Sequence, residues 1–197
     1  MKQVALLALA AVLLAGTGFG QQTITIGFTV SNTGALNVDS TEQYRGFELW
    51  RDQINAAGGF KAGGKSYNIK FATYDDESNS KRVQQLYTRM ILEDKADFLF
   101  SPYSSPLTST AAVVTEQYGK IMLTSGAAEG KTYTLGNHLL FQMFAPAPEY
   151  LKVALDALKT KDPKATVALV NQETSLYVAV VNPAKAKSQQ HGVNEVF

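Results

Sequence analysis

Residues 97–124 read DFLFSPYSSPLTSTAAVVTEQYGKIMLT, and this stretch decides the fold. Residues 97–101 form a short apolar run, which is typical of a buried strand. Residues 107–118 carry apolar side chains at helical spacing up to Gly119, a residue that commonly ends helices. Residues 121–124 are again short and apolar. A strand–helix–strand unit of this length predicts a parallel sheet with helices on both faces.

The same alternation extends towards the N-terminus. Residues 23–30 and 66–74 alternate apolar with polar side chains and predict strands. Residues 41–57 and 81–93 show helical spacing, and Gly58-Gly59 ends the first of these helices. Because crossovers are right-handed, we expect an α/β fold with a doubly wound parallel sheet. Ligands bind such sheets beyond the carboxyl ends of the strands. The loops at that edge are 31–38, 75–78, 101–106 and 124–131.

A second unit follows the Pro-rich segment 144–148, which is typical of a crossover. It is predicted to hold helices at 150–158 and 178–190, the second interrupted at Asn182-Pro183, and strands at 165–171 and 193–197. We therefore expect an N-terminal ligand-binding lobe over residues 21–145, and a hinge with an incomplete second lobe over 146–197. Two strands and two helices form a poor core, so exposed apolar surface is expected along the second sheet.

Residues 1–20 predict a secretory signal peptide that is cleaved. A positive start precedes an apolar run from Val4 to Ala15 and the small residues GTGFG. The alternative is an N-terminal membrane anchor, but the apolar run is shorter than the roughly 20 residues that span a bilayer. The mature protein is therefore expected in the periplasm or outside the cell.

Composition excludes several classes of function. A net charge of +1 gives no reason to expect a nucleic-acid partner. The absence of cysteine excludes disulfides, thiolate metal sites, a cysteine nucleophile and a lipid-modified N-terminal cysteine. The two histidines, His138 and His191, are far apart in the chain, and no Gly-x-Ser-x-Gly or nucleotide-binding motif occurs. No enzymatic activity, metal or cofactor is expected.

The ordered set of motifs resembles the type I periplasmic binding proteins, in particular those that bind branched-chain amino acids. The motifs are SNTG at 31–34, INAAGG at 54–59, YDDES at 74–78, DFLFSPYSS at 97–105 and GKIMLTSGAA at 119–128. The resemblance implies two α/β lobes that close on a ligand. It also implies a monomeric solute-binding protein of an ABC transporter that delivers an amino acid, or a related small carboxylate or amide, to a membrane permease. The alternatives are an exported sensory domain, or a truncated, non-functional fragment of such a binding protein.

The family's carboxylate-binding segment maps onto Ser101 to Ser105. Ser105-Pro106 predicts a helix N-cap followed by the first helical residue, and the positive end of a helix favours a carboxylate. Ser105 either adds a hydroxyl donor to the ligand or serves only as a cap. Ser104 and Tyr103 lie in the same loop. An aromatic ring at Tyr103 either stacks on a ligand or packs under the loop.

The family's second binding segment maps onto Gly126, Ala127 and Ala128. Amino-acid binders of this family usually carry a threonine hydroxyl at the third position, where this chain has Ala128. Glu129 either replaces that hydroxyl or is a solvated carboxylate. In the second lobe, Tyr177 is the candidate to cover the ligand, with packing into the core as the alternative. The pair Asp75 and Asp76 is expected to be structural, and Asp39 either approaches an amine or belongs to a turn.

Overall fold

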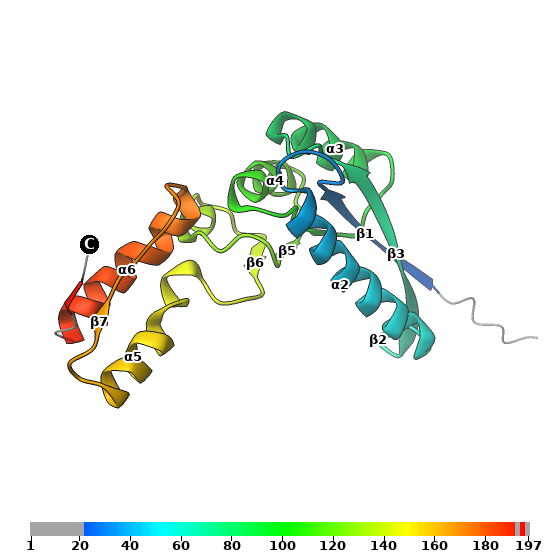
Figure 1. Ribbon diagram of the computed structural model, residues 1–197. Helices are drawn as coiled ribbons and strands as arrows, with labels where there is room; N and C mark the ends of the chain where they lie inside the picture. Colours follow the sequence, from blue (N-terminus) through cyan, green and yellow to red (C-terminus); the bar gives the residue numbers. More distant parts are fainter. Residues whose placement is uncertain (1–21, 192–193, 196–197) are drawn as a thin grey trace, which may run out of the picture.

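The computed structural model describes residues 22–191 and 194–195, so the predicted signal peptide lies outside the described residues. Figure 1 shows a sheet-centred N-terminal part and a largely helical C-terminal part, joined by the chain that follows β6. The expected α/β class, one lobe followed by the start of another, is confirmed.

Six strands form the main sheet in the order β2-β3-β1-β4-β5-β6. Their bounds are β1 Gln22–Val30, β2 Phe60–Ala62, β3 Lys65–Asp75, β4 Phe98–Phe100, β5 Met122–Thr124 and β6 Leu140–Gln142. All neighbouring pairs are parallel except β2 with β3. β1 pairs with β3 along its whole length, from Gln22 opposite Tyr67 to Val30 opposite Asp75. The carboxyl ends of the parallel strands therefore meet at one edge.

Two of these strands were not predicted from the sequence. β2 forms a hairpin with β3 through Gly63-Gly64, whose φ angles of +55° and +73° suit the tight turn between antiparallel strands. β6 is a short edge strand that pairs Leu140 with Met122. The sheet is thus parallel in its centre and carries one antiparallel strand at its edge.

Helices cover both faces of the sheet. α2 (Asn37–Ala56) covers β1 and β3 with an aromatic layer, in which Phe28 lies 5.1 Å from the ring of Phe47 and 5.0 Å from that of Phe71. α3 (Ser80–Leu92) and α4 (Ser105–Gln117) pack on the opposite face against Leu99 and Met122. This two-sided arrangement is the doubly wound architecture that the sequence predicted.

The C-terminal part contains fewer paired backbone groups. Its elements are η2 Ala147–Glu149, α5 Lys152–Lys161, β7 Thr166–Val167, α6 Ser175–His191 and β8 Asn194–Glu195, whereas the short helix η1 Gly130–Tyr133 precedes β6 and belongs to the first part. The predicted strand over 165–171 shortens to β7, which pairs with β8 at only two positions. Residues 193 and 196–197 of the other predicted strand lie outside the described part of the chain.

The predicted interruption at Asn182-Pro183 is wrong, because α6 continues through Pro183. A proline inside a helix lacks one N–H donor and strains the preceding turn. Val181 and Ala184 on either side are buried, so packing of the helix outweighs this local loss. Exposed apolar side chains are present in this part, but they lie outside the β7–β8 pair along which they were expected: Val153 in α5 is 76% exposed and Val170 after β7 is 95% exposed.

Candidate ligand-binding site

The loops that follow β4 and β5 meet at the carboxyl edge of the sheet. The backbone N–H of Ser104 donates to the carbonyl of Gly126 at 3.0 Å. The N–H of Glu129 donates to Oγ of Ser105 at 3.2 Å. The structure therefore brings together Tyr103–Ser105 and Gly126–Ala128, the two segments of the first lobe on which the sequence analysis placed the ligand.

The start of α4 differs from the prediction by one residue. The helix begins at Ser105, and its cap is Ser104, whose Oγ accepts a hydrogen bond from the N–H of Leu107 at 3.5 Å. The predicted N-cap role of Ser105 is therefore wrong, and so is the alternative in which Ser105 serves only as a cap. Ser105 instead occupies the first helical position. Its oxygen accepts from Glu129, which leaves its hydroxyl hydrogen available to donate to another group.

The backbone of Ser104 is strained. Its φ of +86° and ψ of 148° place it in a region that glycine alone adopts readily. Such a conformation costs about 1–3 kcal/mol and persists only where the surroundings impose it. Here the N–H of Ser104 is held by Gly126, and its carbonyl accepts from the N–H of Thr108 at 3.1 Å. Strain of this kind concentrates at ligand-binding loops and active sites.

Gly126 sits where the surrounding atoms leave little room for a side chain. A Cβ atom at this position would lie 3.1 Å from Cα of Tyr103 and 3.0 Å from Nε2 of Gln43. Gln43 comes from α2 and donates to Oγ of Ser125 at 2.6 Å. The sequence analysis missed Gln43, although it lies on the second turn of the helix that follows the expected ligand-facing loop 31–38.

The carbonyl groups of the second segment are all engaged within the protein. The carbonyl of Gly126 accepts from Ser104, that of Ala127 from the phenol of Tyr133 at 2.6 Å, and that of Ala128 from the N–H of Ala147 at 2.9 Å. Tyr133 also hydrogen-bonds the buried hydroxyl of Thr124. Tyr133 is a second residue that sequence reasoning missed, and it holds the segment in place.

Tyrosine side chains gather around the same edge. Burial raises the pKa of the Tyr103 phenol, followed by the charge of Asp39 and a hydrogen bond to it, and then by the nearby phenols of Tyr177 and Tyr150. Tyr177 lies in the first turn of α6, where its N–H donates to Oγ1 of Thr174 at 3.4 Å. Its side chain is 45% exposed, which does not fit packing into the core. The second lobe joins the first at this edge through η2, where the N–H of Ala147 donates to the carbonyl of Ala128 at 2.9 Å.

The loop after β1 is anchored by Asp76. This carboxylate is fully buried and accepts from the hydroxyls of Thr29 at 2.6 Å and Ser31 at 2.5 Å, and from the N–H of Ser78 at 2.9 Å. The N–H of Ser31 in turn donates to Oγ of Ser40 in α2 at 2.8 Å. Asp76 thus has the structural role expected of it, because it joins two loops and the start of α2.

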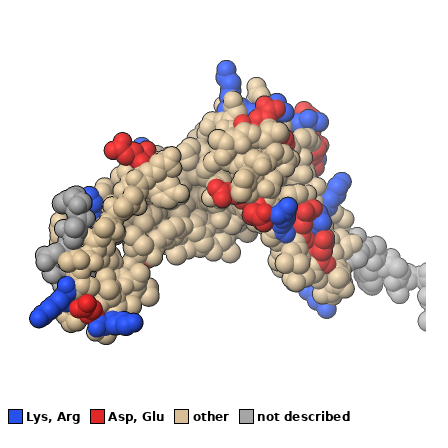
Figure 2. Space-filling model, viewed as in Figure 1, with Lys and Arg blue, Asp and Glu red and all other residues tan. Residues whose placement is uncertain are grey.

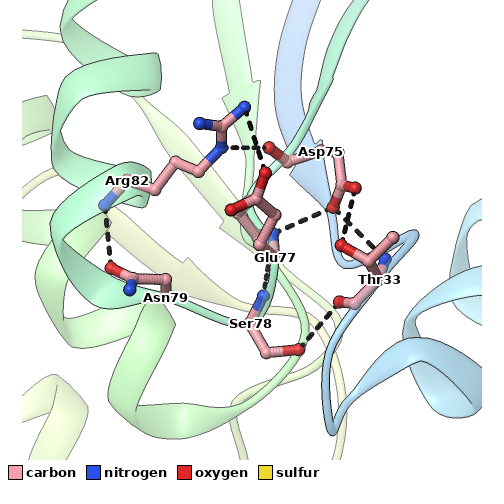
Figure 3. A network of polar contacts seen from close by, with 7 residues as sticks. Thr33, Asp75, Glu77, Ser78, Asn79 and Arg82 are labelled. Carbon is pink, nitrogen blue, oxygen red and sulfur yellow. Dashed lines mark hydrogen bonds and ion pairs between the residues drawn. The ribbon is translucent and has the colours of Figure 1, made fainter.

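Asp75 forms a neighbouring network that Figure 3 shows. Its carboxylate accepts from the hydroxyl of Thr33 at 2.9 Å and from the N–H of Glu77 at 2.9 Å, and its carbonyl accepts from Arg82 at 2.9 Å. Burial raises the pKa of the Asp75 carboxyl, but these N–H and hydroxyl donors outweigh burial and lower it overall. Gly34 fits against this network with φ of +88°, where a Cβ would lie 2.6 Å from Oγ of Ser78.

Groups suited to catalysis or metal binding do not gather here. His138 contacts Glu116 at 3.1 Å, before β6 and at the end of the sheet opposite Ser105 and Ser125. Over the described ranges, no group of three or more His, Cys, Asp or Glu side chains is placed to hold a metal ion.

No helix in the described part of the chain is both long and apolar enough to cross a membrane. In Figure 2, charged side chains of both signs lie mainly towards the two ends of the molecule, and the middle of this face is largely uncharged.

Comparisons with known proteins agree on one family. The family described as periplasmic binding protein matches residues 23–197. A curated amino acid binding protein of Pseudomonas aeruginosa is 28% identical over 175 residues, which are 88% of this chain and 46% of the relative.

Two solved structures share the fold. A solute binding protein of an ABC transporter from Rhodopseudomonas palustris BisB5, in complex with 3,4-dihydroxybenzoic acid, superposes with a TM-score of 0.74 at 17% identity, over 88% of this chain and 46% of that one. A Desulfitobacterium hafniense substrate-binding protein in complex with Leu superposes with a TM-score of 0.72 at 17% identity, over 89% and 50%. The chain thus spans about half the length of the relatives that it matches. Since the family match extends from the first strand to the last residue, this chain belongs to the periplasmic binding protein family.

Proposed function

We propose that this chain acts as an extracytoplasmic solute-binding protein of an ABC transporter. It holds an amino acid, or a related small carboxylate or amide, between its two lobes and presents that solute to a membrane permease. It works in the periplasm or outside the cell and catalyses no reaction. The observation that carries the proposal is the meeting of Ser104–Ser105 with Gly126–Glu129 at the carboxyl edge of the sheet.

The start of α4 supplies the chemistry that a carboxylate needs. The first N–H groups of a helix have no partner within the helix, and the helix dipole places partial positive charge there. Ser105 contributes the N–H of the first helical residue, and its hydroxyl hydrogen can donate as well. Hydrogen bonds to a charged group contribute about 1.5–3 kcal/mol each. Gly126 and the strained Ser104 hold these donors in one geometry before a ligand arrives.

The second lobe completes the enclosure. The two lobes meet beside the site, where the N–H of Ala147 in η2 donates to the carbonyl of Ala128 at 2.9 Å, and Tyr177 lies in the first turn of α6. A ligand on Ser105 would therefore contact groups from both lobes, and closure around it would depend on that ligand. The ligands named for the similar proteins support the class, because leucine and 3,4-dihydroxybenzoic acid both carry a carboxylate.

The proposal is tested by isothermal titration calorimetry of the purified chain with amino acids, their amides and aromatic carboxylates. We expect at least one carboxylate to bind. Ser105→Ala should weaken that binding about tenfold, because a donor to a charged group is lost. Ser80→Ala is the matched control, since Ser80 also occupies the first position of a helix, α3, at an exposed place away from the site. No detectable binding of any ligand in the panel, or equal effects of the two substitutions on binding, would contradict the proposal.

A further inference from the structure

The loops at the carboxyl edge of the sheet form two hydrogen-bonded halves. In the first half, the buried carboxylate of Asp76 accepts from the hydroxyl of Ser31 at 2.5 Å, and the N–H of Ser31 donates to Oγ of Ser40 at 2.8 Å. These bonds fix the loops after β1 and β3 to the first turns of α2. In the second half, the N–H of Ser104 after β4 donates to the carbonyl of Gly126 after β5 at 3.0 Å. A ligand that contacts both halves depends on how they are joined.

The side chain of Gln43 spans the two halves. Gln43 lies one turn after Ser40 in α2, and its Nε2 donates to Oγ of Ser125 at 2.6 Å. The two residues are 82 positions apart in the chain. Because Ser125 directly precedes Gly126, this bond reaches the start of the second binding segment. It therefore ties the segment to the helix that the first half holds in place.

The close fit of Gln43 against Gly126 supports the same role. A Cβ atom at position 126 would lie 3.0 Å from Nε2 of Gln43 and 3.1 Å from Cα of Tyr103. The amide thus lies against the place where the loops after β4 and β5 cross. Gln43 is half-buried and Ser125 is exposed, so we expect their bond to act on the local position of the loop more than on the hydrophobic core.

We propose that Gln43 is a positioning residue of the candidate site, which acts through Ser125 to hold the second binding segment in register with the loops fixed to α2. Its role requires no contact with the ligand. A loop that is already ordered reduces the ordering cost that binding includes. This inference rests on the proposed function, since it assigns a role within that same site.

The test uses substitutions that separate the hydrogen bond from the shape of the side chain. Gln43→Met removes the amide and keeps an unbranched, helix-compatible side chain. Gln43→Glu keeps a link, because the hydroxyl of Ser125 can donate to the new carboxylate. Ser125→Ala removes the partner instead. Gln53→Met is the matched control, because it makes the same substitution in the same helix at an exposed position.

Hydrogen exchange, followed by NMR, measures how firmly the two loops are held. The reporters are the N–H groups of Ser104 and Glu129, which bond Gly126 and Ser105 across the loops. We expect at least about threefold faster exchange at both in Gln43→Met and in Ser125→Ala, with no further increase in the double variant. Gln43→Glu and Gln53→Met should stay within about twofold of the unsubstituted chain. The N–H of Leu99, which bonds the neighbouring strand at 3.0 Å, reports on the whole lobe and should not change.

Calorimetry then connects position to binding. The probes are L-leucine, L-leucinamide and benzoate, one from each class of the panel for the proposed function. A probe that binds should lose about threefold in affinity in Gln43→Met, because binding must then order the loop. Its affinity should return to within about twofold in Gln43→Glu.

The outcomes separate this inference from the proposed function. Unchanged exchange at Ser104 and Glu129 in Gln43→Met overturns the inference, as does a larger effect in the double variant, since Gln43 would then act other than through Ser125. Equally faster exchange at Leu99 shows a general loss of stability and also overturns it. If a probe binds and Gln43→Met leaves its affinity unchanged, the inference is wrong while the proposed function stands. If no member of the full panel binds, the proposed function fails and the role in binding fails with it.

Discussion

The two parts of this chain contain the same kinds of element, strands and helices, but differ in how extensively these elements pair and bury their side chains. In the first lobe, β1 pairs with β3 along nine residues, and side chains such as Leu99 and Met90 are completely buried. In the second, β7 pairs with β8 at two positions, and the buried hydrophobic side chains among the described residues are Ala147, Leu155, Val181 and Ala184. Val170 is almost fully exposed.

This difference matters for the site, because most of its groups belong to the first lobe. Buried apolar area and paired backbone set the free energy of local opening, so the second part should open more readily than the first. The first lobe can therefore hold Ser104, Ser105 and Gly126 in a strained, preorganised geometry. The second lobe adds Tyr177 on an element that is less firmly held.

The largest expected effect comes from one leucine in each part. Leu99→Ala should lower the free energy of unfolding by about 3–5 kcal/mol, because it opens a cavity between α3, α4 and the sheet. Leu155→Ala should cost less, about 2 kcal/mol, because fewer buried neighbours surround it. Urea denaturation is followed by far-UV circular dichroism, which reports on the helices of both parts, and by the fluorescence of the single tryptophan Trp50, which lies 5.9 Å from the ring of Phe100 and reports on the first lobe. Equal losses of unfolding free energy for the two variants would contradict the claim that the second part is less firmly packed than the first.

The next effect concerns the buried anchor of the first loop. Asp76→Asn should lower the free energy of unfolding by about 2–3 kcal/mol. Both carboxylate oxygens of Asp76 accept hydrogen bonds from Thr29, Ser31 and Ser78, whereas an amide has only one accepting oxygen and a donating NH2 group in place of the other. Asp162→Asn in the second part is the control. Asp162 is exposed and accepts one bond, from the N–H of Lys164 at 3.0 Å, so its loss should stay within about 0.5 kcal/mol. Thermal or urea unfolding measures both, and a neutral Asp76→Asn would show that the network does not stabilise the fold.

A smaller effect, of opposite sign, is expected at the strained cap. Ser104→Gly should raise the free energy of unfolding by about 1 kcal/mol, because glycine adopts φ of +86° without strain and replaces a serine cap at little cost. Thr174→Gly at the start of α6 is the counterpart, since Thr174 also caps its helix but has no positive φ. It should lose a few tenths of a kcal/mol. Destabilisation by Ser104→Gly would show that the cap outweighs the strain.

The smallest effect is a pH dependence of the first lobe. The folded-state pKa of Asp75 lies below its ordinary value of 3.8, because N–H and hydroxyl donors outweigh burial. This carboxylate therefore contributes stability that is fully present above that value and is lost as the pH falls through the folded pKa. Urea unfolding at pH 5 and at successively lower pH should show a smaller acid loss for Asp75→Asn than for the unsubstituted chain. Identical acid profiles would contradict the role given to Asp75.

The alternation of apolar and polar residues along the sequence predicted the long strands of the first lobe. β1 and β3 alternate over their whole length, and the structure places them within one residue of the prediction. β6 was missed because LFQ at 140–142 is too short to show a period, and it becomes a strand only because the edge of β5 offers backbone partners. α6 was predicted to break at Pro183 because the sequence does not show how well the flanking residues pack.

The site divides in the same way. Serines before a proline at a helix start, and the small residues after β5, are visible in the sequence and led to Ser104, Ser105 and Gly126–Ala128. Gln43 and Tyr133 were not visible, because their roles are defined by the partners they meet: Gln43 bonds Ser125, 82 positions away along the chain.

By itself the sequence determined the order of the longer strands and helices of the first lobe, the edge at which their loops meet and the approximate start of the helix that suits a carboxylate. These features depend on the period of apolar side chains and on the preferences of neighbouring residues, which act over a few positions. Tertiary structure alone decided that Ser104, rather than Ser105, is the cap and takes a strained φ. It also decided that the carbonyls of Gly126, Ala127 and Ala128 each accept a hydrogen bond within the protein. Which donors and acceptors remain free for a ligand depends on contacts between distant segments, and these exist only once the chain has folded.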